Sequence, residues 1–225
     1  MDRALIVFDM DGVLVDVTES FRETIVRTVE HFTGALVSRE QIQVYKNRGG
    51  FNDDWKLSHQ LISERGVTAE YQAVVEHFQH IFHGNGTDGL ILRERWIARE
   101  GLFERLAARY EFAIFTGRMR WEAEVTLQRF AAGLRFDPII GMEDVQELKP
   151  APEGLLKIAA AAGDRKIFYV GDSVDDARSA RGAGVPFIGI ASATSLERTE
   201  LVSLFEAENA IAIIGDINEL ESVLP

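Results

Sequence analysis

Two aspartates separated by a single residue follow a short apolar run near the start of the chain. Asp9 and Asp11 come directly after Leu5–Phe8, and Gly12 follows them. Side chains alternate between the faces of a strand, so the two carboxylates leave it on the same side. Like charges held this close repel each other unless a cation lies between them or one carboxyl keeps its proton. Either arrangement suits catalysis, although an Asp-Gly pair can also simply make a turn after a strand.

Two later apolar runs also end in polar residues. The acids Asp172, Asp175 and Asp176 follow the run at 166–170, and Thr116, Gly117 and Arg118 follow the run at 111–115. In an open parallel α/β sheet the carboxyl ends of the strands form one crevice in which ligands bind. These side chains would meet there as an anionic, oxygen-lined site, which favours Mg²⁺ over zinc or copper.

The composition limits the possible functions of the 225 residues, of which 46% are hydrophobic and 27% charged. Acidic residues outnumber basic ones by 36 to 24, giving a net charge of −12, which argues against nucleic acid or an anionic membrane as a partner. The lack of cysteine excludes disulfides, thiolate zinc sites and cysteine nucleophiles. No apolar stretch is long enough to span a bilayer, and residues 1–9 resemble a strand more than a signal peptide, so we expect a cytoplasmic protein.

Strand-like and helix-like segments alternate from about residue 101 onward, which predicts a parallel sheet covered by helices on both faces. We expect helices at Phe103–Tyr110, Trp121–Ala132, Pro152–Ala162, Asp175–Ala183 and Leu196–Phe205. Strands are expected at 111–116, Pro138–Met142, 166–171, Phe187–Ala191 and Ala210–Ile214, and Ile217–Leu224 closes the chain.

Residues 16–92 break this alternation. Apolar residues recur at helical spacing in Glu19–Phe32, and Ser38–Tyr45, Asp53–Arg65 and Thr68–Phe82 are also expected to be helical. The pattern predicts a catalytic core formed by residues 1–15 and 93–225, interrupted by a helical module at 16–92. An insertion after the first strand would lie over the acidic crevice as a lid.

Four segments of the chain resemble the four motifs of the haloacid dehalogenase-like hydrolase superfamily, in the order of that family. They are Asp9–Asp16, Thr116–Arg118, Lys149–Pro152 and Gly171–Asp176. The helical module is similar to the cap of the phosphoglycolate phosphatase and β-phosphoglucomutase branch. The resemblance covers essentially the whole chain and implies a Rossmann-like α/β core, with a parallel sheet between helices, and an inserted α-helical cap domain.

The resemblance also implies roles for the core residues. Asp9 is the expected nucleophile, forming an aspartyl-phosphate, and Asp11 is expected to protonate the leaving alkoxide and then deprotonate the attacking water. Mg²⁺ would be bound by Asp9, by the backbone carbonyl of Asp11 and by Asp172.

Three further motif residues are expected to contact the phosphoryl group. The Thr116 side chain and the Gly117 amide would hold its oxygens, and Lys149 would neutralise charge as it develops. Arg118 departs from the small polar residue often found at its position in the family. It therefore either touches the substrate or pairs with a carboxylate.

Asp176, the last acid of the last motif, has two possible roles. Ser173 and Asp176 have the spacing of a helix capping box, so Asp176 could simply stabilise the next helix. We expect it to act at the metal site as well, with Asp175 as the reserve candidate.

In the cap, Lys46, Arg48 and Asn52 lie beside glycines at the point where family caps carry a substrate-specificity loop. They suit an anionic or hydroxylated leaving group, although a solvated basic turn has the same composition. Among the five histidines, His77, His80 and His83 are spaced three residues apart. Such steps do not align on a helix, so we interpret these side chains as surface or packing residues rather than metal ligands.

The sequence therefore predicts a Mg²⁺-dependent phosphatase that hydrolyses a small phosphate monoester, resembling phosphoglycolate, a sugar phosphate or histidinol phosphate. Dehalogenases of the family lack the second acid, so Asp11 disfavours that activity. A β-phosphoglucomutase-like mutase uses the same two aspartates and is the first alternative, and a non-catalytic binding protein on the same scaffold is a distant one. We expect a monomer or homodimer whose partner is a small phosphorylated metabolite rather than nucleic acid or a membrane.

Overall fold

The computed structural model describes residues 3–225, which form two compact units. One unit contains the chain up to Val15 together with Trp96–Pro225, and the other is Asp16–Arg95. The chain thus leaves the first unit after one strand and returns to it some eighty residues later, where the sequence suggested a return at residue 93. Among the described residues, no helix has both the length and the apolar character that crossing a membrane requires.

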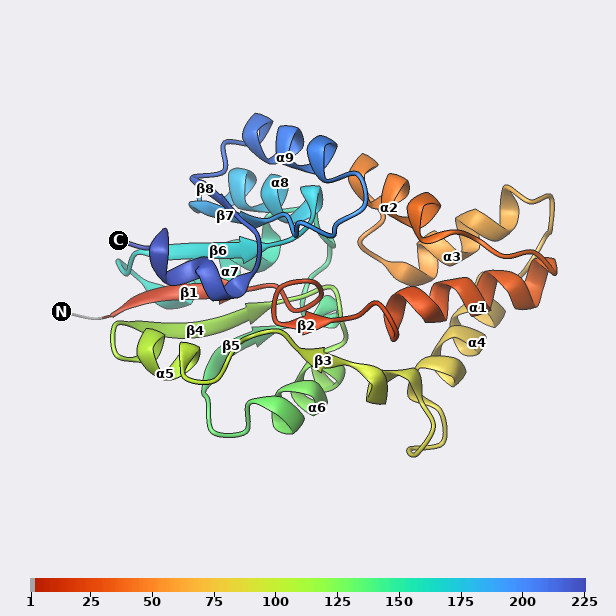
Figure 1. Cartoon of the computed structure of the whole chain (residues 1–225), viewed down its shortest axis with the longest axis horizontal. Coiled ribbons are helices and arrows are strands. Elements are labelled where there is room, and N and C mark those ends of the chain that lie inside the picture. The colour runs from red at the N-terminus through yellow and green to blue at the C-terminus, as the bar shows by residue number, and fades with distance from the viewer. Residues whose placement is uncertain (1–2) are drawn as a thin grey trace. The chain divides into compact units, whose positions relative to one another are not determined.

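The first unit is built on a six-stranded sheet with the order β5-β4-β1-β6-β7-β8 (Figure 1). Its pairings are parallel, and β1 lies between β4 and β6. This confirms the predicted Rossmann-like α/β fold. The strands are β1 (Ala4–Phe8), β4 (Tyr110–Phe115), β5 (Phe136–Ile140), β6 (Ile167–Gly171), β7 (Phe187–Ile190) and β8 (Ala212–Ile214).

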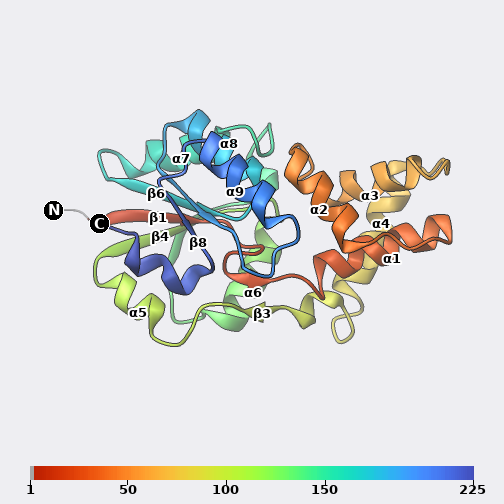
Figure 2. The same cartoon turned by 45° about the horizontal axis from the view of Figure 1, so that its top comes forward.

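Three helices cover one face of this sheet, on the opposite side from α5 and α6 (Figure 2). They are α7 (Glu153–Ala162), α8 (Val174–Ala183) and α9 (Arg198–Ala207). Their apolar side chains, including Leu155 and Phe205, pack with alternate strand residues such as Leu5, Val7 and Tyr169 in one buried cluster. Because strand residues alternate between faces, the other half of each strand is left for the opposite layer.

The opposite face carries a cluster of four phenylalanines. Phe8, Phe112 and Phe136 come from β1, β4 and β5, and Phe103 comes from α5 (Leu102–Ala107). Their ring centroids are 5.3–6.4 Å apart, mostly in edge-to-face pairs. Helix α6 (Arg120–Phe130) lies on this side as well. The central strand β1 is therefore buried on both faces.

Several element boundaries differ from the sequence prediction. Strand β5 begins two residues early and contains Pro138, which is tolerated because β5 is at the edge of the sheet and needs fewer backbone donors. Helix α5 stops at Ala107, because the β-strand already begins at Tyr110. The terminal segment contains a 3₁₀-helix, η3 (Ile217–Ser222).

The second unit is helical. Helix α1 packs against α2, α3 and α4, and α3 also packs against α4. The bounds are α1 (Phe21–Thr33), α2 (Arg39–Arg48), α3 (Asp54–Ser63), α4 (Tyr71–His83) and η1 (Leu90–Arg93). His77 on α4 stacks on His31 of α1 with ring centroids 3.8 Å apart, which is a packing contact between helices. Burial, together with His31 and His80, lowers the pKa of His77.

Two short strands mark the points at which the chain crosses between the units. Strands β2 (Val15–Asp16) and β3 (Arg95–Trp96) pair with each other as a separate two-stranded sheet. The sequence did not indicate either strand, because two residues are too few to show a period. Within the helical unit, Arg95 donates a hydrogen bond of 2.7 Å to Asp16, so the first and last residues of that unit are tied together.

Candidate active site

The site begins where β1 ends. The backbone N–H of Asp9 donates to the carbonyl of Val170 at 2.9 Å, so the pairing of β1 with β6 continues through the aspartate. Its side chain is only 6% exposed, and its Oδ1 atom lies 2.9 Å from Nζ of Lys149. A carboxylate that follows the fully buried residues Leu5–Phe8 is thus held in one position and paired with one cation.

Lys149 connects two buried acids. Its Nζ donates to Oδ1 of Asp9 at 2.9 Å and to Oδ1 of Asp176 at 2.7 Å, and 1% of its side chain is exposed. The ammonium also lies 4.9 Å from the ring centroid of Phe115 and 5.6 Å from that of Tyr169. Two carboxylates and two aromatic faces therefore fix a lysine that would otherwise be flexible.

Asp176 accepts four hydrogen bonds from the protein. Its Oδ1 accepts hydrogen bonds from Lys149 Nζ and from the Tyr169 hydroxyl, the latter at 2.6 Å. Its Oδ2 accepts hydrogen bonds from the Ser173 hydroxyl at 2.6 Å and from the Ser173 backbone N–H at 3.1 Å. A carboxylate has about four lone-pair directions, so these donors use the capacity of the group. Ser173 and Asp176 form the capping box of α8 that their spacing indicated.

Three carboxylates could hold a metal ion. One oxygen from each of Asp9, Asp172 and Asp176 lies within 4.8 Å of the others. Asp172 lies tightly against the turn after β1, because a Cβ atom on Gly12 would be 1.9 Å from its Oδ2. Gly12 has a φ of +73°, so the turn needs glycine for its backbone as well as for this close approach. An all-oxygen anionic set of this kind fits a hard divalent cation such as Mg²⁺.

Asp11 is paired with an arginine. Nε and Nη2 of Arg118 both lie 2.6 Å from Oδ1 of Asp11, and Nη1 donates to the Thr126 hydroxyl at 3.0 Å. The Arg118 side chain is 1% exposed, whereas 30% of the Asp11 side chain is exposed. Of the two possibilities raised from the sequence, the structure thus has Arg118 paired with a carboxylate.

Thr116 and Gly117 follow β4, the neighbour of β1. Thr116 is buried, and its backbone N–H donates to Ile140 at the end of β5 at 3.0 Å. Its hydroxyl accepts the backbone N–H of Arg118 at 3.2 Å. The loop after β4 is therefore held in place at the same edge of the sheet as Asp9.

Burial and charge shift the protonation of this cluster. The pKa of Asp9 is raised to about 7, because burial and the charges of Asp176 and Asp11 together outweigh the opposing effect of Lys149. Burial disfavours charge on Asp176 too, but Lys149 and the hydrogen bonds from Ser173 and Tyr169 together outweigh it and hold the pKa of Asp176 below its ordinary value. The pKa of Lys149 is raised, because its two carboxylate partners outweigh burial. Of these two acids, Asp9 is thus the one whose charge the protein alone stabilises less.

A comparison with protein-family models identifies the family to which this arrangement belongs. The model of the haloacid dehalogenase-like hydrolase family matches residues 6–190, which include each of the core side chains described above. The chain belongs to this family. The match extends from β1 to the end of β7, so the hydrolase core and the helical insertion are both part of it.

Individual relatives share this hydrolase's length to different degrees. Pyrophosphatase PpaX from Bacillus velezensis is 24% identical, over 97% of this chain and 96% of its own. Imidazoleglycerol-phosphate dehydratase from Phytophthora nicotianae is 32% identical over 95% of this chain, which spans about half (48%) of that protein. The solved structure of a phosphatase from Thermococcus thioreducens is 26% identical with a TM-score of 0.62, covering 90% of this chain and 99% of that one. Family and relatives together make this chain an enzyme, a hydrolase of the phosphatase type.

The structure brings together most of the residues expected for this hydrolase from sequence. Asp9, Lys149, Asp172 and Asp176 form one cluster, and Thr116 and Gly117 follow the adjacent strand. Asp175, the reserve candidate, is buried in the first turn of α8 and is absent from the group of potential metal ligands found among residues 3–225.

One contributor was missed. Tyr169 was interpreted only as part of an apolar strand, but its hydroxyl bonds to Asp176 and its ring lies under Lys149. Burial and the nearby charges of Asp176 and Asp9 raise the pKa of Tyr169 well above its usual value, so it remains a donor. A tyrosine within a run of fully buried residues was the available signal, because a buried hydroxyl needs a partner.

The cap residues make contacts within the helical unit. Lys46 Nζ lies 2.5 Å from Asp54 Oδ1 and also donates to the backbone carbonyl of Asn52. The guanidinium of Arg48 lies 4.9 Å from the ring centroid of Tyr45. A role of Lys46, Arg48 and Asn52 in substrate contact stays a prediction.

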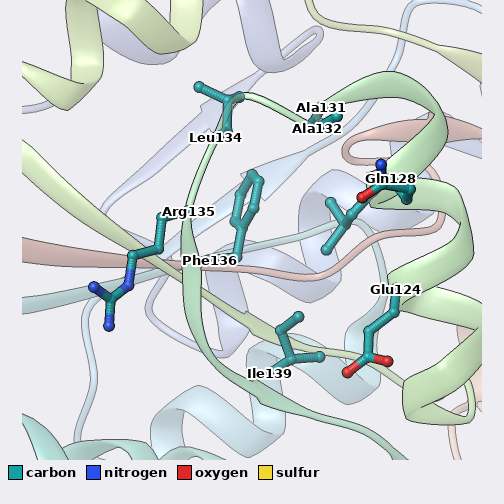
Figure 3. Close-up of a pocket in the computed structure, with 9 residues that line it drawn as sticks. Glu124, Gln128, Ala131, Ala132, Leu134, Arg135, Phe136 and Ile139 are labelled. Carbon is teal, nitrogen blue, oxygen red and sulfur yellow. The ribbon is translucent and has the colours of Figure 1, made fainter.

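A separate groove of 320 Å³ lies between α6 and β5 of the hydrolase core (Figure 3). Its lining includes the apolar residues Leu127, Phe136 and Ile139. Glu124 and Arg135 are its charged lining residues. It includes none of the acidic cluster, so we do not assign it to the active site.

Proposed function

We propose that this hydrolase is a Mg²⁺-dependent phosphatase that cleaves a small-molecule phosphate ester through an aspartyl-phosphate on Asp9. The observation that carries the proposal is the buried Asp9 carboxylate at the end of β1, paired at 2.9 Å with a buried lysine. A phosphoryl group attached there would find a fixed positive charge within contact distance. A binding module needs no such pairing of a nucleophile with a cation.

In the first step, an oxygen of Asp9 attacks phosphorus as the bond to the leaving oxygen breaks. Asp11, two residues further on, gives its proton to that oxygen so that an alcohol departs. In the second step, water attacks the phosphorus of the aspartyl-phosphate, and Asp11 takes up its proton. Orthophosphate leaves, and the Asp9 carboxylate is restored.

Three other groups stabilise the transferring phosphoryl group in this scheme. Lys149 supplies a positive charge whose position is fixed by Asp176 and two aromatic rings. The Thr116 hydroxyl and the Gly117 N–H are the candidates to donate to phosphoryl oxygens. Since the chain carries a net charge of −12, this local positive charge is needed to attract an anionic substrate.

The acidic cluster is the candidate Mg²⁺ site. Because four protein donors occupy Asp176, we assign direct ligation to Asp9 and Asp172, with the backbone carbonyl of Asp11, and a supporting role to Asp176. A divalent cation there would supply the charge that offsets repulsion between the Asp9 carboxylate and the phosphate. Gly12 keeps Asp172 close to the β1 turn, which supports this assignment.

The substrate class remains broad within small phosphate esters. The earlier resemblance favours phosphoglycolate and sugar phosphates. The relative named a pyrophosphatase adds inorganic pyrophosphate. Histidinol phosphate, already a candidate from the sequence, shares an imidazole and a phosphate with the compound in the name of the dehydratase relative. The phosphate is common to all of them, so the core residues serve each candidate equally.

The test is phosphate release from a panel of these esters and pyrophosphate, with Mg²⁺ and with EDTA, using Asp9→Asn as the matched inactive variant. We expect metal-dependent release with one clear favourite and none from Asp9→Asn. Turnover by a folded Asp9→Asn protein would overturn the aspartyl-phosphate route. Interconversion of sugar-phosphate isomers without phosphate release would identify a mutase instead.

A further inference from the structure

We propose that Arg118 is a positioning residue for Asp11 rather than a ligand of the substrate phosphate. The inference rests on the proposed phosphatase function and concerns the same site. Its basis is the contact between the two side chains, in which Nε and Nη2 of Arg118 both lie 2.6 Å from one oxygen of Asp11. A partly exposed carboxylate is thus held by a buried cation.

The guanidinium is itself fixed at its other end. Nη1 donates to the hydroxyl of Thr126 at 3.0 Å, and Thr126 is buried within α6. The backbone N–H of Arg118 is also bound, to the Thr116 hydroxyl at 3.2 Å. Strand β4, its loop and α6 therefore set the position of Arg118, which in turn sets that of Asp11.

This geometry is poorly suited to phosphate binding. Arginine binds phosphate through an exposed edge that offers two parallel N–H groups. In Arg118 one edge faces Asp11, the remaining terminal nitrogen faces Thr126, and 1% of the side chain is exposed. The pair therefore orients a proton-transfer group, because a carboxyl must lie within hydrogen-bond reach of the atom that it protonates.

The consequence depends on the leaving group. When an alkyl ester is cleaved, the P–O bond breaks and its electron pair takes the Asp11 proton to form an alcohol. A nitrophenolate leaves as a stable anion and needs no proton. Loss of Arg118 should therefore slow cleavage of alkyl phosphates far more than cleavage of p-nitrophenyl phosphate, whereas loss of a phosphate ligand would slow both.

The experiment compares Arg118→Met, Arg118→Lys and wild type by kcat/KM on p-nitrophenyl phosphate and on the alkyl phosphate turned over fastest in the panel. The ratio kcat/KM reports phosphoryl transfer to the enzyme, so the shared hydrolysis of the intermediate does not mask the difference. General acids contribute about 10²–10⁴-fold, so we expect Arg118→Met to lose about 10-fold or more on the alkyl ester and less than about 3-fold on the aryl ester. Arg118→Lys, which keeps the charge, should lose less.

A double-mutant cycle tests the route of the effect. In an Asp11→Asn background, Arg118→Met should cause no further loss on either ester, because its target is already gone. Should Arg118→Met fail to fold, Thr126→Val releases only the far end of the guanidinium. It should then give a smaller loss with the same preference for the alkyl ester.

Other outcomes overturn the inference. Equal losses on both esters, with weaker inhibition by orthophosphate, would make Arg118 a phosphate ligand. Equal losses with unchanged phosphate inhibition, or additive losses in the cycle, would make its role merely structural, and an unchanged alkyl rate would give it none. A wild-type protein that releases no phosphate from any ester refutes the proposed function instead, so the two failures are distinguishable.

Discussion

Replacing Asp9 by asparagine should stabilise the metal-free protein while it removes activity. Burial raises the pKa of this carboxyl from 3.8 to about 7. One pKa unit corresponds to about 1.4 kcal/mol, so the charge on folded Asp9 costs up to about 4 kcal/mol at a pH above 7. Asparagine resembles the protonated acid in shape but cannot ionise.

The direction in which stability changes with pH follows from which state, folded or unfolded, binds the proton on Asp9. Between about pH 4 and pH 7 the folded protein holds a proton on Asp9 that the unfolded chain has released. The contribution of Asp9 to stability is therefore fully present below pH 3.8 and is lost as the pH rises through about 7. The stability gained by Asp9→Asn over wild type should grow over this interval and level off above it.

The assay is urea denaturation of wild type and Asp9→Asn in EDTA at several pH values between 4 and 8. Asp16→Asn is a matched control that should change the stability in the opposite direction. Burial of Asp16 is outweighed by hydrogen bonds from Thr18 and Arg95, which lower its pKa. Its carboxylate thus contributes stability at neutral pH that is lost in acid, and Asp16→Asn should destabilise the protein near pH 7.

Addition of Mg²⁺ should reverse the ranking between wild type and Asp9→Asn, because an ion that binds only the folded wild type stabilises it by mass action. The reasoning would be refuted if Asp9→Asn were less stable than wild type in EDTA at pH 8, or if the difference did not change with pH. Either result would mean that the ion pair with Lys149, rather than burial, dominates the energy of Asp9.

Three further changes test neighbouring parts of the site. Gly12→Ala puts a methyl group 1.9 Å from an oxygen of Asp172 in a backbone with φ +73°; we expect a loss of about 1–3 kcal/mol in urea denaturation and weaker Mg²⁺ binding by calorimetry. Lys149→Met leaves two buried carboxylates without their shared cation, so phosphate release should fall at least about 100-fold and the melting temperature should drop; near-normal turnover would contradict the role of Lys149. Ser173→Ala removes the cap of α8 and a donor to Asp176, so thermal denaturation should show a loss of about 0.5–2 kcal/mol in stability. Ser173→Thr keeps the hydroxyl and should retain most of that stability.

The sheet could be predicted from sequence because its signals are local. The central strands are short apolar runs, and acids or a threonine follow β1, β4 and β6 at the point where each ends. The carboxyl ends of parallel strands lie at one edge of the sheet. This rule alone places Asp9, Thr116 and Asp172 near one another, without any knowledge of contacts. The capping box of α8 was similarly visible as a fixed spacing of Ser173 and Asp176.

What the sequence could not give were contacts between residues far apart in the chain. The partner of Arg118 stayed open, because Asp11 lies 107 positions away and no period relates them. The hydrogen bond from the Tyr169 hydroxyl to Asp176 could not be predicted either, because Tyr169 lies within an apolar run. The bounds of α5 and β5 shifted by a few residues, since pairing with the neighbouring strand, rather than propensity, decides where such short elements end.

The two crossings of the chain at β2 and β3 have a consequence for how this protein can diverge. Every side chain of the acid–lysine cluster comes from outside Asp16–Arg95, and the inserted segment leaves and rejoins at paired strands. Insertions, deletions or wholesale exchange between these two points leave the register of β1 with β4 and β6 untouched. The acid–lysine cluster and the helical insertion therefore come from separate stretches of sequence.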